Sequence, residues 1–223
     1  MDKNELIDRL CEDLEPTRAR LSLPLRIVCW VATVFIITAL GILKAQSRAD
    51  FSDLLNNTEY LIEGTLLLVA GISSGILVLF LSVPGWRTKK LVLTVIITGL
   101  IWISSIAATL IFQGSDVQGL STAGLGCSEH ILLFSLIPAV ILTALLRLGS
   151  PLRAHITGAL IFLSSGILTI LLFQFTCASR HPAHLLLYHT LPVGLLTLIG
   201  WILGKWLCGF ESKLERKKKA LLP

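Results

Sequence analysis

The sequence predicts an all-α fold: a bundle of six transmembrane helices preceded by a short cytoplasmic amphipathic helix. Of its 223 residues, 54% are hydrophobic and 15% are charged, and the mean hydropathy of +0.80 is far above that of an ordinary soluble domain. Six apolar runs are long enough to cross about 30 Å of hydrocarbon. Lys and Arg residues gather on alternate sides of these runs, as in multi-span membrane proteins.

The chain begins with an acidic, amphipathic segment. Leu6, Leu10 and Leu14 recur at helical spacing, and Pro16 ends the pattern. Residues 1–15 carry a net charge of −4, whereas helices that lie on anionic lipid are basic. The segment therefore favours a basic protein partner, which would also stabilise a helix too short to be stable alone. The alternative is a frayed tail that only orients the first span.

Six membrane spans follow, and the acidic start of the chain is unlike a cleaved signal peptide. Two glycine pairs, Gly71 with Gly75 and Gly200 with Gly204, are predicted to pack helices within one chain. The domains we expect are a partner-binding tail over residues 1–25, a bundle over 26–207 and a basic cytoplasmic tail over 208–223. The spans are predicted at about 27–43, 59–82, 91–112, 130–146, 156–175 and 186–207.

The basic residues predict the orientation of the bundle. Sixteen of the nineteen Lys and Arg residues fall on one side, and only Lys44, Arg48 and Arg180 fall on the other. The positive-inside rule therefore places both termini in the cytoplasm of a bacterial inner membrane. Membrane lipid is the expected contact of the basic C-terminal tail, and no direct nucleic-acid binding is predicted.

Cysteine and histidine residues gather on the predicted outer side. Cys127 is expected in the loop before the fourth span and Cys177 at the outer end of the fifth, in a compartment where disulfides persist. Three interpretations stay open: a structural disulfide, a thiol pair that responds to oxidation or metal, or a chance grouping with solvated histidines. Thiolate and imidazole bind soft and borderline metals. No cofactor is firmly predicted, and the candidate ligands of a transient soft metal ion are Cys127, Cys177, His130, His181, His184 and His189.

No catalytic motif is present in the sequence. It contains no phosphate-binding glycine loop, zinc-protease motif, nucleophile elbow or Cys-x-x-Cys pair. We therefore predict that the chain is not an enzyme. An alternative is a small membrane transporter or metal-handling protein that uses Glu63, His130 and His189, and a thiol oxidoreductase is a third hypothesis.

Several short motifs occur in order along nearly the whole chain. They are LIDRLCEDLEPTR at Leu6–Arg18, RADF at Arg48–Phe51, SVPGW at Ser82–Trp86, LGSP at Leu148–Pro151, TG at Thr157–Gly158, Cys177, and YH at Tyr188–His189. Together they resemble the NrsF family of membrane anti-sigma factors, named as negative regulators of sigma F.

The resemblance implies a membrane-bound negative regulator of transcription in a Gram-negative bacterium. Its cytoplasmic tail would sequester an extracytoplasmic-function sigma factor and release it on heavy-metal or oxidative stress. The two sensing cysteines of similar proteins would fall on Cys127 and Cys177. Cys11 departs from the family pattern and has no role there. The sigma-binding motif of the tail would fall on Leu6, Leu10, Asp13, Leu14 and Pro16.

Overall fold

The computed structural model describes residues 21–46, 51–83, 88–113, 123–149, 153–177, 179 and 181–208, and within them it contains helices and no strand. The tail residues Leu6, Leu10, Asp13, Leu14 and Pro16, and the basic segment 209–223, lie outside this described part. The elements are α2 (Leu23–Ala45), α3 (Phe51–Asn56), α4 (Thr58–Phe80), α5 (Lys89–Gln113), α6 (Ala123–Arg147), α7 (Ala154–Thr176), α8 (Pro182–His184), a π-helix (Leu185–Thr190) and α9 (Leu191–Cys208).

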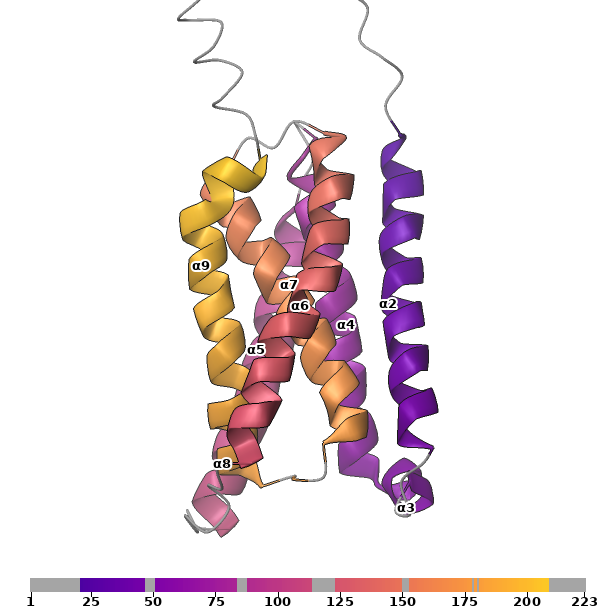
Figure 1. Cartoon of the computed structure of the whole chain (residues 1–223), viewed down its shortest axis with the longest axis vertical. Coiled ribbons are helices and arrows are strands. Elements are labelled where there is room, and N and C mark those ends of the chain that lie inside the picture. Colours follow the sequence, from indigo (N-terminus) through magenta and orange to yellow (C-terminus); the bar gives the residue numbers. More distant parts are fainter. Residues whose placement is uncertain are drawn as a thin grey trace, which may run out of the picture.

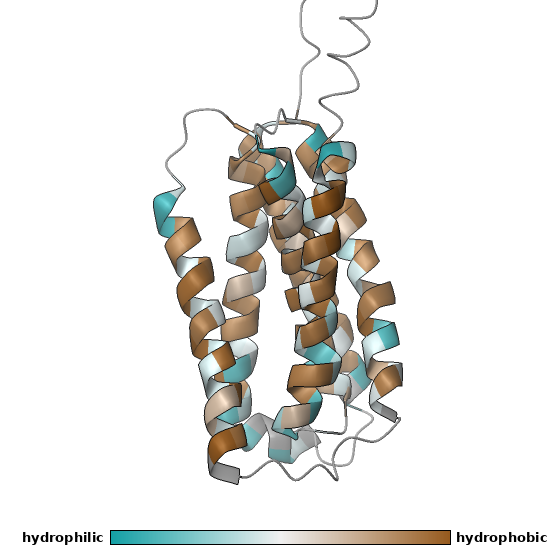
Figure 2. Cartoon of the chain, turned by 90° about the vertical axis from the view of Figure 1, so that its left-hand side faces the viewer, coloured by the Kyte–Doolittle hydropathy of each residue, from teal (hydrophilic) through white to brown (hydrophobic). Residues whose placement is uncertain are grey.

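The predicted six-span α-helical fold is confirmed. Six helical segments of the described chain are long and apolar enough to cross a membrane, and α8, the π-helix and α9 together form the last of them. Apolar residues predominate along these helices, and hydrophilic residues gather towards their ends (Figure 2). The chain is therefore a membrane protein.

The two ends of the bundle differ in what they carry. The start of α2 and the end of α9 lie together at one end, which we call the terminal end (Figure 1). The opposite end, called the distal end here, carries α3 and α8. Because the spans alternate in direction, the described basic residues Lys89, Lys90, Arg147, Arg153 and Lys205 belong to helix ends at the terminal end, whereas Lys44 closes α2 at the distal end.

Helix α7 is the centre of the bundle. It packs against α9, α4, α6 and α2, and 61% of its apolar window is buried, compared with 11% for α5 and 17% for α2. Small residues such as Ser165 and Gly166 make this close approach possible. Ser164 also donates a hydrogen bond from Oγ to the Gly71 carbonyl of α4 at 3.1 Å. A change in the position of α7 would therefore reach most of the other spans.

The predicted glycine pair of α9 packs within the chain. Gly200 and Gly204 face Gly158 and Ala154 of α7, so that the two backbones touch. A Cβ atom at Gly200 would meet the Gly158 carbonyl oxygen and would lie 2.6 Å from Cδ2 of Phe162. Neither backbone can give way without moving a helix.

Gly200→Ala is therefore expected to destabilise the bundle by about 1–3 kcal/mol, the usual cost of overpacking. The measurement is thermal unfolding of the purified chain in detergent. Gly194→Ala is the matched control, because Gly194 lies on the same helix and a Cβ atom there would have no neighbour within 4 Å. Equal unfolding temperatures for the two variants would contradict the close α7–α9 contact.

The start of the fourth span was predicted too late. We expected it at about residue 130, with Cys127 in a loop, but α6 begins at Ala123 and Cys127 is part of the helix. The glycine and serine residues of this segment lower its hydropathy, although tertiary contacts hold it in place. A Cβ atom at Gly124 would collide with the Tyr188 ring, and Ser128 donates from Oγ to the Tyr188 carbonyl at 3.1 Å.

A buried arginine fixes α2 at the terminal end. Arg26, 5% exposed, donates from one guanidinium nitrogen to Ser82 Oγ at 3.1 Å and to the Leu145 carbonyl at 3.5 Å. These contacts join α2 to the end of α4 and to α6. They place the start of the first span, directly after the N-terminal tail, against the rest of the bundle.

Candidate functional site

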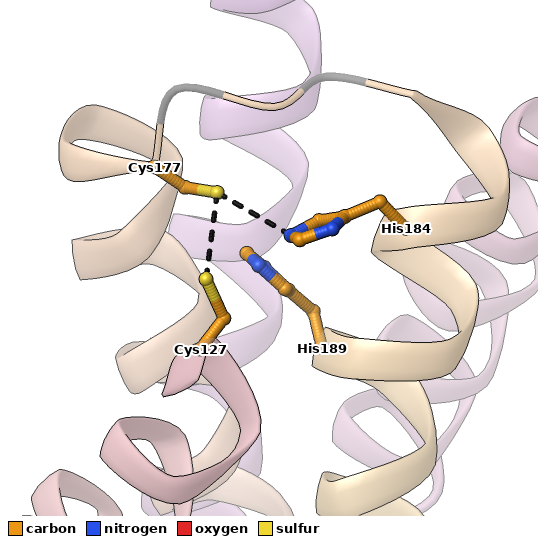
Figure 3. A group of neighbouring side chains, drawn as sticks. All are labelled: Cys127, Cys177, His184 and His189. Atoms are coloured by element: carbon orange, nitrogen blue, oxygen red, sulfur yellow. Dashed lines mark hydrogen bonds between the residues drawn. The ribbon is translucent and has the colours of Figure 1, made fainter. Parts of the chain in front are cut away.

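Four metal-binding or redox-active side chains meet at the distal end. Cys127 comes from α6, Cys177 follows α7, His184 belongs to α8 and His189 to the π-helix, and one ligand atom from each lies within 4.8 Å of the others. Their side chains point toward one another (Figure 3). We call these four residues the Cys/His cluster.

The two cysteines reach the cluster from two different helices. The Cys177 N–H still donates to the Phe173 carbonyl, at 2.7 Å, but its backbone is extended, so α7 ends here and the side chain turns toward α6. Both cysteines are partly buried. Their Sγ atoms lie 3.8 Å apart, beyond the about 2.05 Å of a disulfide. The pair is therefore a dithiol in this structure.

The histidines are brought together by an unusual helical turn that follows from Pro192. A proline has no N–H and crowds the carbonyl four residues earlier, which here belongs to Tyr188. The Tyr188 carbonyl instead accepts the hydrogen bond from Ser128 of α6. The backbone before Pro192 widens into the π-helix, where the Leu191 N–H donates to the Leu186 carbonyl five residues back.

This π-helix explains why His184 and His189 share one side. In an α-helix, residues five apart are turned by about 140° from each other. A π-helix closes its hydrogen bonds between residues five apart, so the two histidines come close to alignment. Their ring centroids lie 5.2 Å apart.

His189 is the most deeply buried polar group of the cluster. Its side chain is 0% exposed, and neither Nδ1 nor Nε2 has a hydrogen-bond partner among the described residues. His184 is 4% exposed, and its Nε2 lies 3.5 Å from Cys177 Sγ. A buried polar group without a partner costs about 1–3 kcal/mol. Such a cost is common at sites that bind a ligand.

The cluster can perform two kinds of chemistry. Two thiols at this distance can be oxidised to a disulfide, with loss of two electrons and two protons to an oxidant. Alternatively, two thiolates and two imidazoles can bind a soft or borderline metal ion. Both reactions would join α6 to α7, and metal binding would also join them to the segment that leads into α9.

The other predicted ligands lie outside the cluster. His130 is exposed on α6 and its Nδ1 contacts the Gly126 carbonyl at 2.5 Å. Nδ1 of His181 accepts a hydrogen bond from the Ala183 N–H at 3.3 Å and so caps the start of α8. Glu63, named for the transporter alternative, lies on α4 and is not among the four grouped residues.

Sequence reasoning missed the residues that position the cluster. Ser128, Tyr188 and Pro192 carry no metal-binding or redox chemistry and were not singled out as site residues. One signal was available: a proline eight residues after His184 and three after His189 suggests a locally altered helix in which the histidine spacing could differ from that of an α-helix.

Comparison with known protein families gives one match. Residues 10–209 match the family model described as "NrsF: Negative regulator of sigma F". The matched range contains the whole Cys/His cluster and, of the predicted tail motif, Leu10, Asp13, Leu14 and Pro16. No curated protein and no solved structure matches the chain.

Proposed function

The chain belongs to the NrsF family of negative regulators of sigma F, and we propose that it is an inner-membrane anti-sigma factor whose sensing site is the Cys/His cluster. Family membership implies a sigma factor as its partner. We propose further that this partner is of the extracytoplasmic-function class, that both termini are cytoplasmic, and that oxidative or metal stress at the cluster releases it. Its role would be regulatory rather than catalytic.

The observation that carries this proposal is the separation of the cluster from the termini. The dithiol lies at the distal end, whereas α2 begins and α9 ends at the terminal end (Figure 1). The basic residues near the terminal end favour the cytoplasm for that side, and the distal end would then face the periplasm. Such a protein can receive a signal on one side of the membrane and act on the other.

The output would be the acidic tail. Leu6, Leu10 and Leu14 at helical spacing form an apolar stripe suited to a groove on the sigma factor. The net charge of −4 over residues 1–15 suits the basic surface with which a sigma factor contacts promoter DNA. Binding of the tail would thus compete with promoter recognition.

The input would be a change in the bonding of Cys127 and Cys177. Oxidation or metal binding would fix the end of α7 to α6. Because α7 contacts α2 directly, a shift of α7 can reach the helix that follows the tail. The two states that such a signal needs would differ in helix packing, and the stress would act by favouring one of them.

The test is co-purification of a sigma factor with the full-length chain from detergent-solubilised membranes. We expect one extracytoplasmic-function sigma factor to be retained under unstressed conditions, and a reporter promoter of that factor to be silent. The reporter should become active when the chain is absent. Failure of every such sigma factor of the source bacterium to bind, together with an unchanged reporter, would refute the proposal.

A further inference from the structure

We propose that the Cys/His cluster is a tetrahedral site for a divalent ion of the zinc class, such as Zn²⁺ or Cd²⁺, with His184 and His189 as ligands beside the two thiolates. This inference rests on the proposed function in one respect: the ion would be a signal received at the sensing end. The binding site itself is argued from the geometry, burial and charge of the four residues.

The distances between ligand atoms fit a tetrahedral ion. With Zn–S bonds of about 2.3 Å and Zn–N bonds of about 2.0–2.1 Å, a tetrahedron has S–S edges of about 3.8 Å and S–N edges of about 3.5 Å. The cluster has 3.8 Å between Cys127 Sγ and Cys177 Sγ, and 3.5 Å between Cys177 Sγ and His184 Nε2. Since all four atoms lie within 4.8 Å of one another, small side-chain rotations would complete the coordination.

The burial of His189 is an independent indication of a ligand. Its side chain is 0% exposed and points into the cluster with both ring nitrogens unpartnered among the described residues (Figure 3). A purely structural histidine at this depth would be expected to hydrogen-bond to a neighbour. Coordination through one ring nitrogen supplies the missing interaction and stabilises the neutral imidazole that a metal requires.

Charge decides which class of ion fits. Two thiolates and two neutral imidazoles carry a total charge of −2, so a divalent ion gives a neutral site. A monovalent copper ion would leave one negative charge in an environment that already buries His184 and His189. Binding converts two thiols to thiolates, and two protons are therefore released for each ion bound.

The bound ion would connect elements that meet only at this point. Cys127 belongs to α6, Cys177 follows α7, and His184 and His189 precede α9. The ion would thus clamp the distal ends of three spans. It would also exclude the disulfide, because both thiolates are occupied, and oxidation by a peroxide would in turn release the ion. Metal and oxidant would therefore produce two different bonded states of the same two cysteines.

The test is titration of the purified, reduced, metal-free full-length chain with Co²⁺ under anaerobic conditions. We expect one Co²⁺ per chain, the intense visible absorption of tetrahedral Co²⁺, thiolate-to-metal charge-transfer bands, release of two protons, and displacement of Co²⁺ by Zn²⁺. His184→Ala and His189→Ala should each weaken binding by more than about 100-fold, since even loss of a supporting outer-shell group costs about 10–100-fold.

Matched controls separate ligation from folding. His130→Ala and His181→Ala remove distal-end histidines outside the cluster and should bind Co²⁺ as the unsubstituted chain does. His189→Cys keeps a fourth ligand and should bind Co²⁺ with a stronger thiolate charge-transfer band, which a merely structural histidine would not produce. No Co²⁺ binding, an octahedral spectrum, or unchanged affinity in the His184→Ala and His189→Ala chains would overturn the proposed site.

The readouts distinguish this inference from the proposed function. Co²⁺ binding is measured on the chain alone, so its failure overturns the metal site while sigma co-purification is unaffected. The converse result, Co²⁺ binding by a chain that retains no sigma factor, would support the site and refute the anti-sigma role.

Discussion

Leu10→Asp and Leu14→Asp are each expected to weaken binding of the sigma factor by at least about 10- to 100-fold and to activate its promoters without any stress. Burial of one leucine contributes about 1.5–3 kcal/mol, and 1.4 kcal/mol corresponds to a factor of ten in affinity. The introduced aspartate must in addition be desolvated in an apolar groove. The two substitutions together should abolish detectable binding.

Co-purification of the sigma factor with the full-length chain measures this effect directly, and the reporter promoter measures its consequence in cells. Leu221→Asp makes the same chemical change in the C-terminal tail and should leave binding intact. Asp13→Asn removes one charge of the tail and should weaken binding less than Leu10→Asp does, more strongly at low salt than at high salt. Undiminished binding by both leucine variants would exclude a helix-in-groove contact.

Most of the fold followed from hydropathy. The predicted spans agree with α2, α4, α5 and α7 to within a few residues, because long apolar runs are required by the bilayer whatever the tertiary contacts. The fourth span deviated because its first turns are held by contacts with Tyr188 rather than by hydropathy. Long-range contacts of this kind cannot be read from local composition.

The site was predictable in part. Topology placed Cys127 and Cys177 at the same depth, and the structure brings their sulfur atoms within 3.8 Å. The selection of two histidines from four candidates depended on the π-helix before Pro192, which changes the side on which His189 lies. A pattern of α-helical periodicity cannot anticipate that change. The sigma-binding motif of the tail stays a prediction.

The route from the site to the tail is short in terms of packed elements. Cys177 ends α7, α7 packs along α2, and Arg26 ties the start of α2 to Ser82 and the Leu145 carbonyl at the terminal end. A rigid shift of α7 would therefore act on a helix whose first turn is also fixed to α4 and α6. The polar contacts of Arg26 are the part of this path that must rearrange if α2 moves.

Cys127→Ser and Cys177→Ser are expected to reduce stress induction of the sigma-dependent reporter to the unstressed level. A serine hydroxyl is close in size to a thiol, so the packing at the distal end should survive, but it neither forms a disulfide nor binds soft metals in place of thiolate. Cys29→Ser and Cys208→Ser are the matched controls, because these cysteines lie outside the cluster, and they should leave induction intact.

The resting level of the reporter in the same strains separates a sensor from a structural disulfide. If the cysteines only stabilised the bundle through a disulfide, their loss would lower the unfolding temperature of the purified chain and raise the reporter even without stress. A sensing pair that is reduced at rest predicts the opposite pattern: an unchanged unfolding temperature, a silent resting reporter and no induction by peroxide or Cd²⁺. Normal induction in both variants would show that the signal enters elsewhere, because no other pair of described cysteines is grouped with histidines at the distal end.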